Sequence, residues 1–448
     1  MAIATERKST LAVKLELASI TPTATGSGTT ITFSASHGLA VGDVIGNPTK
    51  GYRTIVSVTS ATVVEVDSAF ITALSTDTVN KQNYGVDPTI GATDVIEFVP
   101  PFTFEPDRAE IARNVVNRSF DEIEPIMGQE SVAGDISIEL HGSGTAAQAP
   151  ESDPLWQCAI GEVDASQSST THATTPCTTT SVVLVASGGA KFKVGHHIVI
   201  DIGGTYEVSR VTAIATDTLT VSPAFSVAPA VSKAVGAGIH YKPTLTELHS
   251  IWSPFWRGDI TKETYKGNKC AGLALDFKAG QATNPKFSFK GKETGAPVAG
   301  AYTLGTPAYD TGKANIGRYM VVKVGGVLYP VSDVSINVAN DLFERTDVTK
   351  SGIHSLIRTK RTITGSFSLL YENKDIEDVF RAGTTAELMV VSSAGDINLT
   401  LGNIFVLSLP KIKYTKVPKS VDSGLYKYDV TFKAVRQSGE DSIFVSFL

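Results

Sequence analysis

Hydrophobic and polar residues alternate along much of the chain, which is the period of a β-strand with one buried face. Residues 132–140 read VAGDISIEL, so Ile136, Ile138 and Leu140 fall on one side of an extended segment. The polar positions between them are Asp135, Ser137 and Glu139. We expect a strand whose apolar face packs on a core and whose polar face meets solvent or a solvent-filled channel.

A second segment repeats this pattern. Residues 363–371 read ITGSFSLLY, and Gly365 occupies the place that Gly134 has in the first segment. Phe367, Leu369 and Tyr371 take the apolar positions, and Ser366 and Ser368 take polar ones. A pattern that occurs twice in one chain indicates an internal duplication.

Each alternating segment is followed by a short stretch with helical spacing, and we expect helices at residues 153–160 and 375–382. Asp153 with Pro154, and Asp375, mark the two beginnings, and a glycine follows each stretch. Aspartate caps free N–H groups, proline suits a first helical turn, and glycine suits the residue after a helix.

A smaller repeat lies within the first half. Residues 41–70 and 194–225 are both rich in β-branched residues, with Gly, Asn or Asp between the apolar runs. Matching positions are Val41-Gly42 with Val194-Gly195, Tyr52 with Tyr206, and Ala69-Phe70 with Ala224-Phe225. Short strands separated by such turn residues predict a small β-barrel or sandwich. We place the two modules at residues 21–84 and 167–241.

Spacing indicates that these modules are insertions. LALDFKA (273–279) matches YDVTFKA (428–434) in alternation, yet Gly134 to Phe277 spans 143 residues and Gly365 to Phe432 spans 67. The difference, 143 − 67 = 76, is close to the length of the second module. The expected first domain is therefore discontinuous, and the full division is 1–20, 85–166 and 242–292 for the first domain, 293–312 for a Gly/Pro-rich linker, and 313–448 for the second domain.

The order of these segments resembles the tail tube proteins of long-tailed bacteriophages. The resemblance rests on ITGSFSLLYENKDIEDVFRAG (363–383), LTLGNIFVLSLPKIKYTKVPKSVDSGLYKYDVTFKAV (399–435) and YKGNKCAGLALDFKAGQATNPKFSFKGK (265–292). It implies a mainly β fold, with two tandem antiparallel β-sandwich or barrel domains that each carry one short helix, plus two small all-β insert domains.

The resemblance also implies a function. Such subunits contribute strands to an inner β-barrel and stack as rings into the channel for viral DNA. Two tube domains in one chain imply a trimeric ring with pseudo-sixfold symmetry. Asp135, Ser137, Glu139, Ser366 and Ser368 would then line the bore. An ordinary solvated sheet face is the alternative for this polar row.

The same resemblance implies the binding partners of the protein and its location. It implies contacts with the tape measure, tail terminator and distal tail proteins, transient passage of DNA, and a virion tail assembled in the host cytoplasm. The inserts would lie outside the tube, could contact a host surface, and should be removable without loss of assembly. Residues 114–130 and 340–360 would include loops that reach a neighbouring ring, with plain surface loops as the alternative.

Composition is consistent with a cytoplasmic globular protein. A net charge of −6 argues against tight wrapping of duplex DNA, which needs clustered Lys and Arg. The chain shows no secretory signal and no apolar run long enough to span a bilayer. Cys158, Cys177 and Cys270 are odd in number and widely spaced, which argues against a disulfide framework or a zinc motif.

No catalytic, cofactor-binding or metal-binding motif stands out, so we expect no cofactor and no enzyme. His196 and His197 are adjacent in an expected strand and point to opposite faces, which prevents joint chelation. Trp156, Trp252 and Trp256 are expected in the core or at a subunit contact, with a sugar platform as the alternative. The sequons at 117–119 and 398–400 are read as chance. Two other functions remain open, a tail-tip or host-surface-binding protein and a hydrolase on a β-sandwich.

Overall fold

The structure is a computed structural model that describes the chain except residues 1–7, 42, 48–50, 71–72, 83, 114, 116–122, 247–248, 347–352, 373 and 396–400. The fold is mainly β, as expected, with two α-helices in the described part. Both sequons lie outside the described residues, and the two expected inter-ring loops lie partly outside them.

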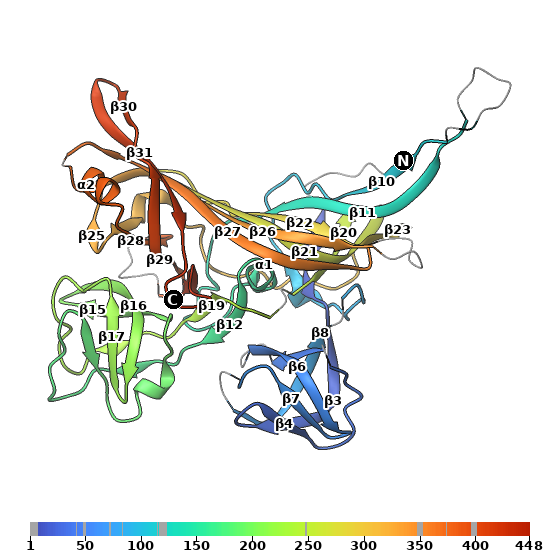
Figure 1. Cartoon of the computed structure of the whole chain (residues 1–448), viewed down its shortest axis with the longest axis horizontal. Coiled ribbons are helices and arrows are strands. Elements are labelled where there is room, and N and C mark those ends of the chain that lie inside the picture. The colour runs from blue at the N-terminus through green and yellow to red at the C-terminus, as the bar shows by residue number, and fades with distance from the viewer. Residues whose placement is uncertain are drawn as a thin grey trace.

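Eight strands form one continuous antiparallel layer in the described part of the chain, which we call the long sheet (Figure 1). Their order in the sheet is β10 (Glu105–Ile111), β11 (Ile126–Ser137), β22 (Lys286–Gly291), β21 (Thr261–Lys278), β26 (Val331–Arg345), β27 (Ser355–Leu370), β31 (Leu425–Ala434) and β29 (Ile404–Lys416).

Shorter strands extend this sheet beyond β29. On its two sides β29 pairs with β28 (Ala386–Ser393) and β32 (Phe444–Phe447). The further strands are β24 (Val321–Val324), β25 (Val327–Leu328), β19 (Ile239–Pro243) and β12 (Gly161–Ala165). A last short strand, β30 (Lys419–Asp422), pairs with β31.

A second group of strands is joined to the long sheet through β21. Residues 261–268 of β21 pair with β20 and β23, and residues 269–278 pair with β22 and β26. The members of this second group are β1 (Thr10–Ala12), β2 (Lys14–Leu15), β9 (Val95–Ile96), β20 (Ile251–Arg257) and β23 (Glu293–Ala299). The strand β21 therefore belongs to both groups.

The two helices occur where the sequence predicts them, α1 at Asp153–Ala159 and α2 at Asp375–Ala382. Gly383 ends α2 with φ of 63°, a left-handed conformation that glycine adopts without strain. The expected aspartate caps are wrong, because neither helix has a side-chain cap hydrogen bond. Asp153 instead accepts hydrogen bonds from Tyr241 Oη at 2.7 Å and Gln157 Nε2 at 2.7 Å.

One core joins the two halves of the body. Trp156 of α1 is fully buried and packs against Tyr241, Phe287, Phe405 and Phe447, two of which precede residue 300 and two of which follow residue 400. Burial of apolar surface on this scale is the main stabilising contribution to folding. The short helix thus fixes strands of the first half against strands of the second.

Residues 17–82 form a closed six-stranded barrel, which we call the barrel unit. The order around the barrel is β3 (Leu17–Gly26), β4 (Thr30–Phe33), β7 (Val63–Val66), β6 (Gly51–Ser60), β5 (Val44–Asn47) and β8 (Leu74–Gln82). Its interior is a separate apolar cluster that includes Ile31, Ile45 and Val64.

Residues 169–235 form a second compact sheet, which we call the six-stranded unit. Its order is β13 (Ser169–Thr170), β18 (Ala234–Val235), β15 (His197–Ile202), β16 (Thr205–Ala215), β17 (Thr218–Ser222) and β14 (Ser181–Val183). A bridge between Thr171 and Leu184 connects the two ends of this order. Taken in chain order, its strands pair in the same succession as those of the barrel unit.

The chain enters and leaves each unit at neighbouring points. Leu17 lies opposite Gln82 where β3 pairs with β8. Ala165 lies opposite Ile239 where β12 pairs with β19, immediately outside the six-stranded unit. The barrel unit and the six-stranded unit lie on the same side of the long sheet in Figure 1.

The register corrects one sequence match. Gly365 of β27 lies opposite Phe432 of β31, but Gly134 of β11 lies opposite Phe289 of β22. Phe277 does not correspond to Phe432, because residues 273–278 of β21 lie one strand further from β11. The alternation of apolar and polar residues is the same around Phe277 in β21 and Phe289 in β22, so it could not show which of the two strands pairs with β11. The expected linker at 293–312 also begins with a strand, β23, which pairs with β21.

Candidate functional site

The expected polar row lies on one face of the long sheet, apart from Glu139. Asp135 is opposite Ser288, Ser288 is opposite Gly272, Gly272 is opposite Ala339, and Ala339 is opposite Thr362. Directly opposed residues point to the same face, and positions two apart on a strand share that face. Ser137, Ser366 and Ser368 are therefore on the same face as Asp135.

The opposite face of the long sheet is the core. Ile136, Phe287, Leu273, Val338 and Ile363 form the adjacent row and are all buried. This row packs toward α1, whose Trp156 contacts the Phe287 ring with a centroid distance of 5.2 Å. The polar row thus faces away from the body of the protein.

Lysines accompany the acids on the polar face, which sequence reasoning did not find. Lys286 Nζ lies 2.8 Å from Asp135 Oδ2, and Ser288 Oγ donates to Asp135 Oδ1 at 2.6 Å. Lys278 is opposite Asp333, and Lys360 is opposite Asp341. The face carries charges of both signs in neighbouring positions and is not an acidic wall. The alternation of residues 286–290, KFSFK, was the available signal for these lysines.

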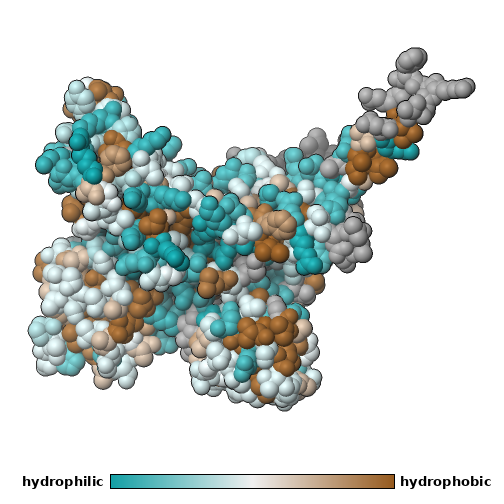
Figure 2. Space-filling view, viewed as in Figure 1, coloured by the Kyte–Doolittle hydropathy of each residue, from teal (hydrophilic) through white to brown (hydrophobic). Residues whose placement is uncertain are grey.

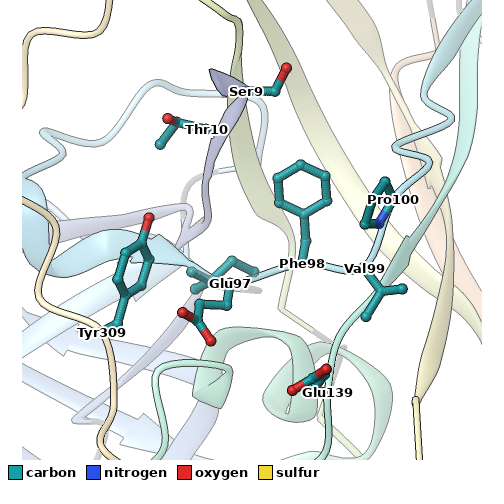
Figure 3. A pocket seen from close by; sticks show the side chains of 9 residues that line it. Ser9, Thr10, Glu97, Phe98, Val99, Pro100, Glu139 and Tyr309 are labelled. Atoms are coloured by element: carbon teal, nitrogen blue, oxygen red, sulfur yellow. The ribbon is translucent and has the colours of Figure 1, made fainter. Parts of the chain in front are cut away.

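Glu139 lies outside the strand that was expected to carry it. The strand β11 ends at Ser137, and Glu139 is an exposed residue that lines a cavity with Glu97 and Tyr309 (Figure 3).

Both ends of the long sheet have backbone available for pairing. In the described residues, β10 pairs with β11 alone. At the other end, residues 413–416 of β29 pair with β31 alone, because the ladder with β28 ends at Ile412. Unpaired strand edges bind other strands readily, so soluble proteins protect them or use them for assembly.

Exposed apolar side chains cluster on the β10–β11 hairpin. Ile111, Val115, Ile126 and Met127 are each more than half exposed. The hairpin projects from the body in Figure 1, and hydrophobic residues gather toward its end in Figure 2. The β30–β31 hairpin also exposes Val421, Leu425 and Tyr426. Exposed apolar groups of this kind mark interaction sites.

Buried histidines attach the six-stranded unit to the body. His196 lies 3.0 Å from Asp164, and its ring stacks on that of His240 at 4.0 Å. His197 bonds Ser446 at 2.6 Å and Ser408 at 2.8 Å. Burial holds the pKa values of His197 and His240 well below the ordinary value, so both rings are neutral. The two adjacent histidines make separate contacts, as expected, and both are structural.

Apolar and ionic contacts complete this attachment. Val199 and Val208 of the unit pack with Met389, Ile404 and Val406 of β28 and β29 in one buried cluster. Arg210 pairs with Glu387 at 2.8 Å. The six-stranded unit therefore covers apolar surface of the body.

The barrel unit has a smaller set of contacts. Arg53 pairs with Glu162 at 3.1 Å, with both side chains buried, and Lys242 lies 3.5 Å from the same carboxylate. The Tyr52 ring contacts His249 at 4.3 Å.

The remaining candidate residues are structural. Trp156, Trp252 and Trp256 are buried, which excludes a sugar platform on their faces. The three cysteines are free and buried, and burial raises the pKa of each thiol, so none is an activated nucleophile. Within the described residues, no helix has the length and apolar character needed to cross a membrane.

Comparison with known proteins agrees with these features. The family model described as phage tail tube protein matches residues 79–434, which include the whole long sheet and the six-stranded unit. No curated protein matches the chain. The match covers more than half of the chain, and the chain belongs to the phage tail tube protein family.

Proposed function

We propose that three copies of this chain form a ring and that stacked rings form the channel through which viral DNA passes. The family establishes a structural tail tube protein, which is a component of the virion tail. The observation that carries the finer proposal is the long sheet, which has one core face, one polar face and an unpaired edge at each end. Joining the edge of β10 to that of β29 in the next copy would continue the sheet into a closed wall.

The threefold symmetry rests on the repeated order of elements in the two halves. Each half contributes a long hairpin, then a short helix, then two further strands of the long sheet. The first half supplies β10, β11, β22 and β21, and the second supplies β26, β27, β31 and β29. We infer a duplicated tube domain, so that a trimer presents six similar segments around the bore.

The polar face would be the wall of the bore. Asp135, Ser137, Ser366 and Ser368 are our proposed lining residues, together with Lys286. Phosphate binding requires clustered unpaired cations, whereas Lys286 is paired with Asp135. The hydroxyls and the Asp135–Lys286 pair would retain DNA weakly. Near the other end of this face, Lys413 and Lys433 lie opposite each other.

The barrel unit and the six-stranded unit would lie on the tube exterior as related insertions. Their common strand order and their closely spaced points of attachment support this placement. We propose that the tube also contacts the tape measure, terminator and distal tail proteins, that it assembles in the host cytoplasm, and that it catalyses no reaction.

Cross-linking tests the ring. Single cysteines are introduced in residues 105–111 and 413–416 of the same chain, and assembled particles are oxidised. The native cysteines are buried, which keeps the background low. We expect covalent species that end at a trimer for at least one pair, and none when the second cysteine is moved to exposed Ser75 of the barrel unit.

Electron microscopy of the purified chain distinguishes the alternative. Hollow tubes with threefold symmetry support the proposal. Discrete single rings that never stack would indicate a tail-tip protein, and a covalent hexamer would refute the trimer.

A further inference from the structure

Three potential metal ligands from separate parts of the sequence meet near the cavity of Figure 3. A ring nitrogen of His141 and one carboxylate oxygen each from Glu97 and Glu151 lie within 4.8 Å of one another. Glu97 also lines the cavity, whose volume is about 430 Å³, where Figure 3 shows it with Glu139 and Tyr309. The cluster therefore has access to solvent through Glu97.

His141 is the second observation that points to a ligand. Its side chain is only 7% exposed, and Nδ1 lies 3.1 Å from the carbonyl oxygen of Gly142. A neutral ring that donates from Nδ1 keeps a lone pair on Nε2, and no hydrogen-bond partner for Nε2 occurs among the described residues. Metal-binding histidines have this arrangement, in which one nitrogen donates to a carbonyl and the other binds the ion.

Backbone contacts hold Glu151 in place. Its Oε1 accepts the Glu97 N–H at 2.6 Å, and its Oε2 accepts the Asp310 N–H at 3.0 Å. Asp310 Oδ2 in turn accepts the Glu151 N–H at 2.6 Å. Hydrogen bonds to a carboxylate from a second layer orient it for coordination.

Negative charge at this place has no Lys or Arg partner in the described part of the chain. Glu97 and Glu139 line the cavity, Glu151 lies beside Glu97, and Asp310 is bonded to Glu151. None of these four carboxylates forms an ion pair with Lys or Arg among the described residues. A bound cation would offset the mutual repulsion of these groups.

We propose that Glu97, His141 and Glu151 form a binding site for a divalent transition-metal cation of the Zn²⁺ class. Three atoms within 4.8 Å of one another have a common point no more than about 2.8 Å from each, so small side-chain movements reach the 2.0–2.2 Å of zinc bonds. An imidazole with two carboxylates suits Zn²⁺ or Mn²⁺ better than Mg²⁺. Solvent would occupy the open coordination position on the cavity side.

The site would act as a cross-link. Glu97 follows β9, His141 follows the end of β11, and Glu151 precedes α1. Asp310 belongs to the segment that connects the two halves, and it is held by Glu151. The cation would fasten this connecting segment to the first half. Spacing motifs could not reveal the site, because its ligands are separated by 44 and 10 positions.

The test uses the full chain after removal of metals with EDTA. Equilibrium dialysis against Zn²⁺ measures stoichiometry and affinity, and Co²⁺ absorption reports the ligand set. We expect one Zn²⁺ per chain, a rise in Tm with Zn²⁺, and competition by Mn²⁺ that exceeds competition by Mg²⁺. Glu97→Gln and His141→Gln should each weaken binding at least about tenfold, and His141→Gln should alter the Co²⁺ spectrum.

Glu139→Gln is the matched control. It removes the same charge from the same cavity without removing one of the three ligands, and its affinity should stay within about threefold of the original. Glu97 is exposed, so its variant is expected to fold even if the His141 variant does not. Absence of saturable binding, or equal weakening by Glu139→Gln and Glu97→Gln, would overturn the proposal. Neither result bears on ring formation, which is scored by microscopy.

Discussion

Asp135 of β11 and Lys286 of β22 form an ion pair, with Oδ2 and Nζ 2.8 Å apart, on the polar face of the long sheet. Both side chains are partly exposed, so the pair contributes less than about 1 kcal/mol to stability. The pair also affects the electrostatic potential of the polar face, because the charges of Asp135 and Lys286 cancel each other at short range.

Asp135→Lys places two cations side by side and changes the charge of the face by two units per chain. We expect tubes of normal diameter, since a polar surface position tolerates lysine. DNA ejection should be slower, most clearly at low salt, because unpaired lysines form phosphate contacts. Ejection kinetics at two salt concentrations measure this. Lys286→Glu, which makes the face more acidic, should not slow ejection. An unchanged rate for Asp135→Lys would show that this face is not the bore.

Gly134 and Gly365 are required by close packing. A Cβ at Gly365 would collide with the Phe432 ring and the Ser335 carbonyl oxygen, and one at Gly134 would collide with the ring and Cα of Phe104. We expect either substitution by alanine to lower the free energy of unfolding by about 1–3 kcal/mol. Gly300→Ala is the control, because a Cβ there meets open space. Urea denaturation measures all three, and equal stability would mean that the strands shift without cost.

Acid should destabilise the protein through its buried histidines. Burial lowers the pKa of His249 to about 3, and those of His197 and His240 also lie well below the ordinary value. Below pH 6.5 the unfolded chain binds protons that the folded chain does not, so stability is complete above pH 6.5 and falls as the pH decreases. Each histidine contributes up to about 1.4 kcal/mol per pH unit in this range.

His249→Gln isolates one of these contributions. The slope of stability against pH between 6 and 4.5 should decrease by about one proton relative to the unchanged chain. Chemical denaturation at several pH values measures the slope. An identical slope would mean that His249 is protonated in the folded protein.

Glu16 should have the opposite effect on the pH dependence of stability from the buried histidines. Burial raises its pKa to about 7, although Ser250 and the N–H groups of Gly85 and Gly267 donate to it. The folded state holds this proton more tightly than the unfolded state, so the contribution is complete below about pH 4.5 and is lost as the pH rises to 7. The loss is about 3 kcal/mol. Glu16→Gln should abolish it, which urea denaturation at pH 5 and 8 would detect. A variant that keeps the full pH dependence would show that Glu16 is ionised in the folded state throughout.

The barrel unit and the six-stranded unit should differ in their response to deletion. Joining Leu17 to Gln82 through a short linker removes the barrel unit, and Lys242 still neutralises Glu162. Removing the six-stranded unit exposes Met389, Ile404 and Val406. We expect assembly to persist in the first case and aggregation in the second, as measured by light scattering and microscopy. Loss of assembly without the barrel unit would place that unit in a subunit contact. The buried apolar contact of the six-stranded unit with β28 and β29 thus replaces the sequence-based expectation that either unit could be removed without loss of assembly.

Local patterns predicted local structure well. Residues 153–160 and 375–382 contain the two helices, since proline, glycine and apolar spacing act within a few residues. The faces of β11 and β27 were also predicted, because alternation decides them directly. Pairing was harder to predict. Phe277 and Phe289 both lie in segments of alternating apolar and polar residues. Only the strand pairing in the folded protein shows that Phe289 is the residue opposite Gly134.

The residues of the polar face were predicted only in part, because strand pairing could not be read from the sequence. Asp135 and Ser366 were placed on polar strand faces, but their common face depends on three strands between them. Lys286 was not found because it lies far from Asp135 in sequence. Glu139 was misplaced because β11 ends two residues earlier, which alternation does not reveal.

The shared strand β21 has a mechanical consequence. Its 18 residues run without a break through both groups of strands, so a load applied to one group reaches the other through covalent bonds. Residues 261–265 and 272–274 lie between paired strands on both sides, so bending either stretch would break several hydrogen bonds at once, whereas residues 267–271 have at most one paired neighbour. In the proposed tube, each group of strands should therefore move as a rigid block, and any bending within a subunit should concentrate at residues 267–271 of β21.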